Sequence, residues 1–380
     1  MATLPPLAIE EAPAPPRAGA SVWSALGLLL VLVGALAALD RVTGDARAAA
    51  GATPGGGASV LAVLVGVAWL AVAAHEAGHL LGGRWMGFRF HLFVVGPVRL
   101  SRVGGRVRPG LNRSMALGGG VALSVPPDAR ELRTRFAAVA AGGPAASLAC
   151  AAAAAAAYAL VGDWPLARLC LGVFAVLSAA LGAVTLVPNA AGGLPSDGAR
   201  LLRLARPGAV GERDAAVMAL GAVSAAGLRP RDWDPGVVRT ALSVADGGFD
   251  EALARLLAYR HALDSGRPAE AGEHLRRALV LAPATPAPFR PVLQLEAAFF
   301  EAAHRGDPGA ARRRLDGAAA SPMAEPALRL RAEAAVLAAE GEGARAADLA
   351  SRARAALAAS LDRGGAACDE AALDIIARQA

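Results

Sequence analysis

The chain has 380 residues, of which 55% are hydrophobic, and its formal net charge is +6. Its mean hydropathy of +0.43 is too high for an ordinary soluble protein, so part of the chain is expected to lie in lipid. The arginines are spread along predicted helices and form no cluster with aromatic residues, which argues against a nucleic-acid partner.

Residues 1–20 are rich in proline and alanine and hold nothing that could bury a core, so they predict a disordered tail. Residues 21–39 are uncharged and long enough to cross a bilayer at about 1.5 Å per residue, and they predict a first membrane helix. A cleaved signal peptide is the alternative. Against it, no basic residue precedes Arg17 and the apolar run is longer than is usual in such peptides.

Three further apolar segments predict membrane helices, at residues 59–82, about 136–161 and about 166–187. The first two of these are joined by a segment, from Arg84 to Arg135, that carries ten arginines but only two carboxylates. The positive-inside rule places that segment in the cytoplasm. Four spans then give a multi-pass protein of the cell membrane with both termini in the cytoplasm.

The arginine-rich segment also carries a strand pattern. Residues 88–93 alternate between apolar and polar side chains, and the dipeptides Gly96-Pro97 and Gly104-Gly105 separate the runs that follow. This pattern predicts two or three short strands. Their apolar faces are expected to lie against the membrane surface or the helix bundle.

Residues 210–380 predict a cytoplasmic α-helical domain, in which glycine, alanine and leucine recur about every forty residues at spacings that resemble a tetratricopeptide repeat. The matching residues are Gly266, Ala271, Leu275, Ala278 and Pro283, then Gly306, Ala311, Leu315 and Ala318, and in a weaker third copy Gly341, Ala346, Ala350 and Ala353. Any alanine-rich helical hairpin gives partial matches, but the recurrence favours a helical solenoid, a fold that offers a surface to a protein partner.

The strongest chemical motif lies near the end of the second predicted span, where His75-Glu76-Ala77-Gly78-His79 forms an HExxH sequence. On a helix the two histidines lie on one face and can bind one metal ion, with the glutamate beside them. Such groups are expensive in an apolar span, about 2 to 3 kcal/mol for each ionised group, and are usually retained for function. The alternative is that they hydrogen-bond one another or mark a helix end that emerges into water.

A catalytic zinc site needs a third protein ligand and one open position. Few carboxylates are available at membrane level on the cytoplasmic side, and Asp197 is one of them, because it follows the fourth predicted span after a turn rich in glycine and proline. Its alternative role is to begin a helix, with Ser196 as the N-cap. Both roles are compatible.

The HExxH sequence followed by an Asp-Gly pair at residue 197 resembles the site-2 protease family of intramembrane zinc metalloproteases, over residues 59–205. The resemblance implies that His75, His79 and Asp197 are zinc ligands and that Glu76 is the general base. The first predicted span and the helical domain lie outside the shared core. Zn²⁺ is also the metal expected for two imidazoles and a carboxylate.

Gly143-Pro144 in the third predicted span resembles a glycine-proline step found between the two motifs of the family. One position departs from the family pattern, since Thr185 stands three residues before Pro188 where members commonly have asparagine. Threonine is a weaker hydrogen-bonding substitute, which Asn189 is placed to compensate. The departure puts catalysis in more doubt than metal binding.

The function implied is hydrolysis of peptide bonds in or near the membrane-spanning segments of protein substrates in the lipid bilayer. Glu76 would take a proton from water and pass it to the leaving amine. Edge strands within residues 88–112 are predicted to hold the locally unwound substrate by strand addition. The alternative function is an inactive membrane scaffold that binds partners through its helical repeats. A transporter or channel is disfavoured, because the four spans show no inverted repeat.

Overall fold

The computed structural model describes residues 7, 44–51, 56–112, 119–189, 195–321 and 323–379. The chain divides into two compact units, which we call the apolar unit (residues 18–207) and the C-terminal unit (residues 208–380 together with 1–17). The predicted span at residues 21–39 lies outside the described residues, as does the predicted tail apart from Leu7. The described part is mainly helical, with one small antiparallel sheet.

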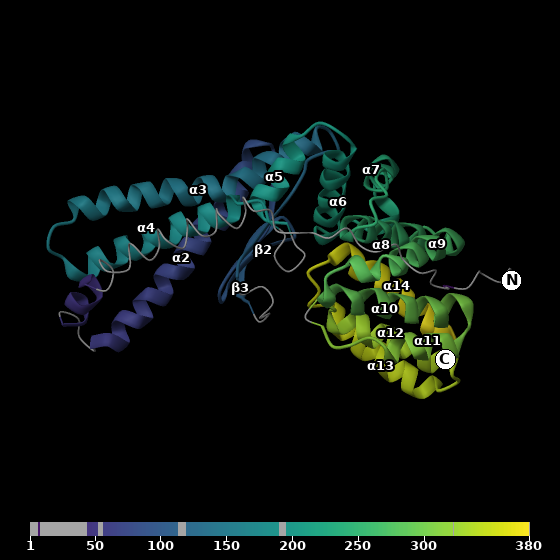
Figure 1. Cartoon of the computed structure of the whole chain (residues 1–380). Coiled ribbons are helices and arrows are strands. Elements are labelled where there is room, and N and C mark those ends of the chain that lie inside the picture. Colours follow the sequence, from purple (N-terminus) through teal and green to yellow (C-terminus); the bar gives the residue numbers. More distant parts are fainter. Residues whose placement is uncertain are drawn as a thin grey trace. The chain divides into compact units, whose positions relative to one another are not determined.

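Three long helices dominate the apolar unit, namely α2 (Gly56–Trp85), α3 (Leu132–Leu160) and α4 (Pro165–Leu186). Each is long and apolar enough to cross a membrane, so three of the predicted spans coincide with membrane-length helices. The three helices run side by side, and α2 ends, α3 begins and α4 ends at the same end of the bundle (Figure 1). The short helix α5 (Asp197–Ala205) lies at that end.

Small residues allow α2 and α3 to approach closely. A Cβ atom at Gly78 would collide with the backbone carbonyl of Gly142, and one at Gly82 would collide with the backbone carbonyl of Ala138. Gly78 and Gly82 are four residues apart and therefore share one face of α2, in the small-xxx-small arrangement of closely packed membrane helices. The part of α2 that carries the HExxH sequence is thereby held against α3.

A four-stranded antiparallel sheet lies in the segment between α2 and α3. Its strands are β1 (Arg89–Val95), β2 (Val98–Val103), β3 (Arg106–Leu111) and β4 (Val121–Val125), in the order β3-β2-β1-β4. The strands predicted between residues 88 and 111 are confirmed. β4 was not predicted, although its alternating residues lie between Gly120 and Pro126.

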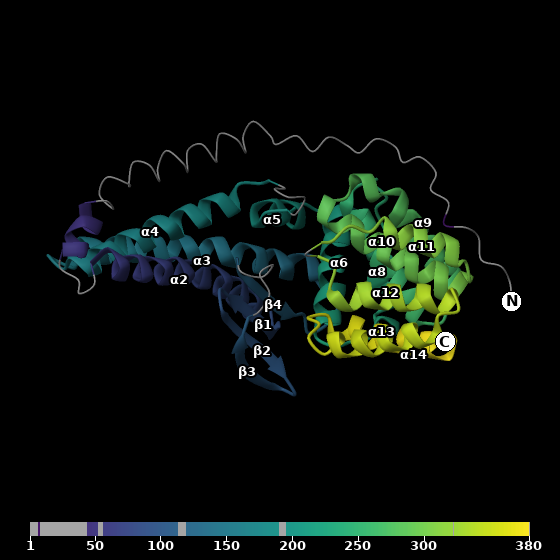
Figure 2. The ribbon, with the colours of Figure 1, turned by 90° about the horizontal axis from the view of Figure 1, so that it is seen from below.

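The sheet is anchored to the helices along one side. β1 and β4 contact α2 (Figure 2). The ring of Phe88 packs edge-to-face on Phe136 of α3. Among the described residues, β4 pairs with β1 alone and β3 with β2 alone, so these two are the edge strands. The β3 residues are exposed, whereas β4 lies against the helix that carries the HExxH sequence.

The C-terminal unit is built from helices around an alanine-, leucine- and phenylalanine-rich core. The α-helices are α6 (Ala209–Ala225), α7 (Pro235–Ala241), α8 (Phe249–Asp264), α9 (Pro268–Val280), α10 (Arg290–Phe300), α11 (Pro308–Asp316), α12 (Pro326–Ala339), α13 (Gly343–Leu357) and α14 (Arg363–Gln379). The shorter turns are η3 (Pro230–Asp232), η4 (Ala282–Ala284), η5 (Ala287–Phe289) and the π-helical η6 (Glu301–Arg305). Helix pairs α8–α9, α10–α11 and α12–α13 pack as neighbours.

These three helix pairs use glycine in the same place. Gly266, Gly306 and Gly341 lie just before α9, α11 and α13, with φ angles of 72°, 64° and 82°, a backbone conformation that favours glycine. The alanines and leucines that recur in the sequence are buried in the same unit, and they are Ala271, Leu275, Ala278, Ala311, Leu315, Ala318, Ala346, Ala350 and Ala353. The recurring residues therefore have one structural role in each pair.

Candidate metal centre

Two histidines and a carboxylate meet at the end of α2. His75 Nε2 lies 3.1 Å from Asp197 Oδ2, and His79 Nε2 lies 3.5 Å from the same oxygen. Asp197 follows His75 by 122 residues, so the fold brings distant parts of the chain together. One ligand atom of each residue lies within 4.8 Å of the others, which is close enough for the three to hold a metal ion.

Both imidazole rings are oriented by partners in α3. His75 Nδ1 lies 2.9 Å from Ser147 Oγ, and His79 Nδ1 lies 2.8 Å from the backbone oxygen of Val139. A carbonyl oxygen only accepts hydrogen bonds, so Nδ1 of His79 carries a proton. Nε2 of the neutral ring then presents a lone pair towards Asp197.

This tautomer makes the centre suitable for a metal. The lone pair on His79 Nε2 and the oxygen of Asp197 are both acceptors, and two facing acceptors repel each other unless a cation lies between them. A metal ion or an extra proton would meet that need. Hydrogen bonding of the second ring nitrogen to a fixed partner is also the arrangement found around metal-bound histidines.

A glycine in α3 makes room for the second histidine. A Cβ atom at Gly143 would collide with the imidazole ring of His79. The next residue, Pro144, lies inside α3 and has no N–H to donate to the helix. The Gly143-Pro144 step therefore lies directly beside the candidate ligands.

Asp197 is held in place by the start of α5. Ser196 is the N-cap of this helix, and its Oγ accepts a hydrogen bond of 3.2 Å from the backbone N–H of Ala199. Gly198 follows because a Cβ atom there would collide with the carbonyl of Leu186 at the end of α4. The predicted helix-start role of Asp197 is thus present together with its proximity to the histidines.

The charge of Asp197 is stabilised by the same neighbours. Burial raises the pKa of its carboxyl, but hydrogen bonds from His75 and His79, when each ring carries a proton on Nε2, outweigh burial and hold that pKa below its ordinary value. Asp197 is therefore an anion at neutral pH, as a metal-ligating carboxylate must be.

Glu76 lies beside this cluster on α2 and is contacted by β4, the strand that was not predicted from the sequence. The backbone N–H of Ala122 in β4 is within hydrogen-bonding reach of the Glu76 carboxyl. A Cβ atom at Gly120, just before β4, would lie only 2.9 Å from Glu76 Oε1. The edge strand β4 therefore runs next to the predicted general base. The alternation of Val121–Val125 was the available sequence signal.

Thr185 and Asn189 contact their own chain near the end of α4. Thr185 Oγ1 donates to the backbone oxygen of Leu181 at 2.9 Å, which is the usual back-bonding of a helical threonine. Asn189 Nδ2 donates to the backbone oxygen of Val187 at 2.9 Å. The threonine hydroxyl hydrogen is thus already used within its helix.

No protein-family model, curated protein or solved structure matches this chain. The centre is defined by its own geometry, as two histidines and one carboxylate at the end of a membrane-length helix. Function is therefore argued from these residues.

Proposed function

We propose that the chain is an intramembrane zinc metalloprotease of the site-2 protease type. The observation that carries the proposal is the convergence of His75, His79 and Asp197 next to Glu76. Three membrane-length helices supply the setting. With residues 21–39 as a further span, four spans in the cell membrane place both termini in the cytoplasm.

Each residue of the centre has a role in the proposed reaction. His75, His79 and Asp197 would hold the zinc. Bound zinc supplies Lewis acidity, which makes water more acidic and polarises a peptide carbonyl. Glu76 takes a proton from water and delivers it to the leaving amine. Ser147 and the Val139 carbonyl keep the imidazole rings directed at the centre.

The proposed substrate-binding strand is β4. Sequence reasoning placed strand addition on residues 88–112, which include the edge strand β3, but β4 is the edge strand next to Glu76. An extended peptide added to its open edge would pass the general base. Ala122→Pro removes the N–H that faces Glu76, and we expect slower cleavage with unchanged bound zinc. Unchanged cleavage would count against β4.

For the C-terminal unit we propose a tetratricopeptide-like solenoid. Three helix pairs with a left-handed glycine at equivalent positions and buried alanine and leucine on matching faces support it. Such repeats present concave surfaces to peptides or helices, so this unit is the proposed site for a protein partner.

The test combines elemental analysis with cleavage of a model membrane-spanning peptide, using the full chain in detergent. Wild type is expected to hold about one zinc and to cleave. Glu76→Gln should keep the zinc and lose cleavage by roughly 10²- to 10⁴-fold, the usual range for a proton-transfer residue. Asp197→Ala should lose the metal. Asp163→Ala is the matched control, because that aspartate is exposed in the loop between α3 and α4.

The outcomes separate the candidate functions. Absence of metal from purified wild type, together with no uptake of added zinc, would overturn the protease proposal. Stoichiometric zinc without cleavage of any membrane-spanning peptide would instead support a membrane scaffold that works through its helical repeats.

A further inference from the structure

Leu7 is buried in the C-terminal unit. Among positions 1–43 the structure describes this residue alone. The composition of residues 1–20 predicts a disordered tail for this part of the chain. Its side chain is only 3% exposed and belongs to the same hydrophobic cluster as Leu293 and Phe300 of α10. A leucine more than 280 positions earlier in the chain thus completes part of this core.

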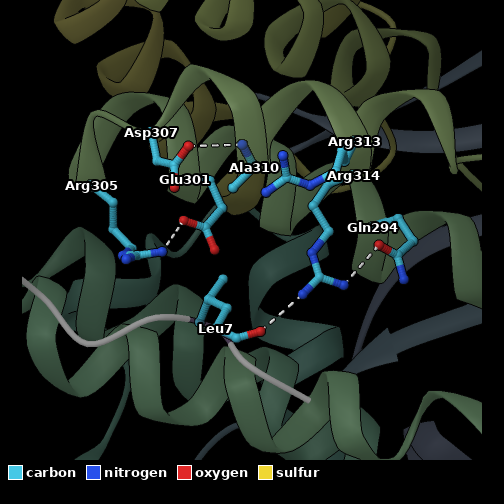
Figure 3. Close-up of a pocket in the computed structure, with 8 residues that line it drawn as sticks. All are labelled: Leu7, Gln294, Glu301, Arg305, Asp307, Ala310, Arg313 and Arg314. Carbon is cyan, nitrogen blue, oxygen red and sulfur yellow. Dashed lines mark hydrogen bonds and ion pairs between the residues drawn. The ribbon is translucent and has the colours of Figure 1, made fainter.

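Leu7 also forms part of the wall of a cavity of about 410 Å³, whose other lining residues belong to α10, η6, α11 and the turn before α11 (Figure 3). The guanidinium of Arg314 donates a 2.9 Å hydrogen bond to the backbone oxygen of Leu7. The other terminal nitrogen of Arg314 lies 3.3 Å from Gln294 Oε1, which fixes the direction of the guanidinium. Both the side chain and the main chain of Leu7 are therefore recognised, which is how a protein groove selects an extended peptide.

The wall of the cavity has an unusual backbone. The segment Glu301–Arg305 is π-helical, and such segments occur often at functional sites. It continues into Gly306 and then into Asp307, whose carboxylate caps α11 through the N–H of Ala310 at 2.8 Å. This π-helical segment, Gly306 and Asp307 thus connect α10 to α11 beside Leu7.

Charge in the cavity suits the segment that carries Leu7. The lining includes the cations Arg305, Arg313 and Arg314 and two acids, one of which, Glu301, is paired with Arg305. The sequence places Glu10 and Glu11 three and four residues after Leu7, within about 14 Å for an extended chain.

We propose that the surface of α10, η6 and α11 beside this cavity is a docking site for the chain's own segment around Leu7. The leucine side chain packs in the hydrophobic cluster with α10, Arg314 holds its carbonyl oxygen, and the arginines next to it suit an acidic peptide. Docking ties the C-terminal unit to a point 14 residues before the apolar stretch at residue 21. A partner peptide with the same chemistry would release the unit by competition. The inference does not rest on the proteolytic function.

Photo-cross-linking of the full chain in detergent tests the proposal. A p-benzoylphenylalanine residue in place of the exposed Arg313 should capture the segment, and trypsin should release it as a single peptide ending at Arg17, the first basic residue. The same probe at Arg312 is the matched control. Arg312 lies on the same helix but pairs with Glu340 and does not line the cavity.

Two variants and a labelling step complete the test. Leu7→Met should preserve the cross-link, whereas Leu7→Asp should lower its yield at least roughly tenfold, since a buried leucine side chain is lost. In a mixture of light and isotopically heavy chains, the two peptides of each cross-linked product should carry the same label. The proposal is overturned if position 313 gives no cross-link, or if Leu7→Asp gives the same yield as wild type. It is also overturned if every cross-link joins a light chain to a heavy chain, because the site would then bind the segment of a second copy.

Discussion

The two units are both helical, but they place apolar side chains in opposite ways. In α2, α3 and α4 only 17%, 33% and 17% of the most apolar window is buried, and Leu61, Leu70 and Leu81 are exposed. In the C-terminal unit, Leu293 and Phe299 are fully buried. A lipid-facing helix is apolar on the outside and a water-facing helix is apolar on the inside, so the two patterns suit different solvents.

Buried polar groups differ between the units as well. In the C-terminal unit Arg331 forms ion pairs with both Glu296 and Asp369, so positive and negative groups neutralise one another. In the apolar unit, His75 and His79 both face the single carboxylate of Asp197, and in the neutral form of His79 this contact joins two acceptors that need a proton or a metal ion between them. Balanced buried ion pairs are typical of structure, whereas buried ionisable groups that need a further ion are typical of a binding site.

The largest loss of stability is expected when the buried ion pairs of the C-terminal unit are broken. Arg331 is 2% exposed, and Arg331→Met would leave Glu296 and Asp369 buried without that partner. We expect the C-terminal unit to lose about 3 to 5 kcal/mol of unfolding free energy. Hydrogen exchange of α10 and α12 in the full chain measures this loss without interference from the apolar unit.

The matched control is Arg345→Met, because Arg345 pairs with Glu342 on the surface, where ion pairs contribute little. If α10 and α12 exchange as slowly in Arg331→Met as in wild type, then the buried network does not hold this unit together, and the contrast between the units fails.

The second effect concerns space beside the candidate ligands. Gly143→Ala places a methyl group against the imidazole of His79, so we expect zinc affinity to fall by roughly ten- to hundredfold, as for other disturbed ligand orientations. Gly66→Ala is the control, since nothing lies within 4 Å of a Cβ there. Competition with a zinc chelator measures both. Equal affinities would contradict the position assigned to the His79 ring.

The sequence pointed to the three residues that the fold brings together, although their role as ligands stays a prediction. The spacing of His75 and His79 is local, and a helix turns any such spacing into a shared face. Asp197 was singled out by its place after an apolar span together with the resemblance to the family. The strands at residues 88–111 were likewise predictable, because alternation and glycine turns are local patterns.

The remaining features depend on contacts between distant segments. Ser147 and Val139 orient the histidines only because α2 and α3 cross at their glycines, and one sequence does not reveal where two helices cross. β4 has five residues and exists by pairing with β1. Leu7 is buried only because it packs in the core of the C-terminal unit, with residues far along the chain. Residues 1–20 are rich in proline and alanine, and that composition carries no information on this contact.

A smaller effect should come from two serines that look alike in the sequence. Ser147 and Ser178 are both fully buried in membrane-length helices, but Ser147 contacts His75 at 2.9 Å, whereas Ser178 Oγ has no hydrogen-bond partner among the described residues. We expect Ser147→Ala to weaken zinc binding about tenfold. Ser178→Ala should leave zinc binding unchanged and the protein slightly more stable. Zinc titration and thermal unfolding in detergent measure the two.

Equal zinc affinity in these two variants would mean that Ser147 is only a packing residue. If zinc affinity falls in Ser147→Ala but not in Ser178→Ala, then a buried serine of this unit supports metal binding only where it contacts a candidate ligand.

The smallest effect is expected at the position that departs from the family pattern. The Thr185 hydroxyl donates to Leu181 within α4, so Thr185→Val should change cleavage little. Thr185→Asn adds an amide that can reach a substrate, and one new hydrogen bond of about 1 kcal/mol corresponds to roughly fivefold faster cleavage. Steady-state cleavage of the model peptide measures both variants. Slower cleavage by Thr185→Asn, with normal zinc, would indicate that the end of α4 is adapted to threonine and that substrate is held elsewhere, for which β4 is the remaining candidate.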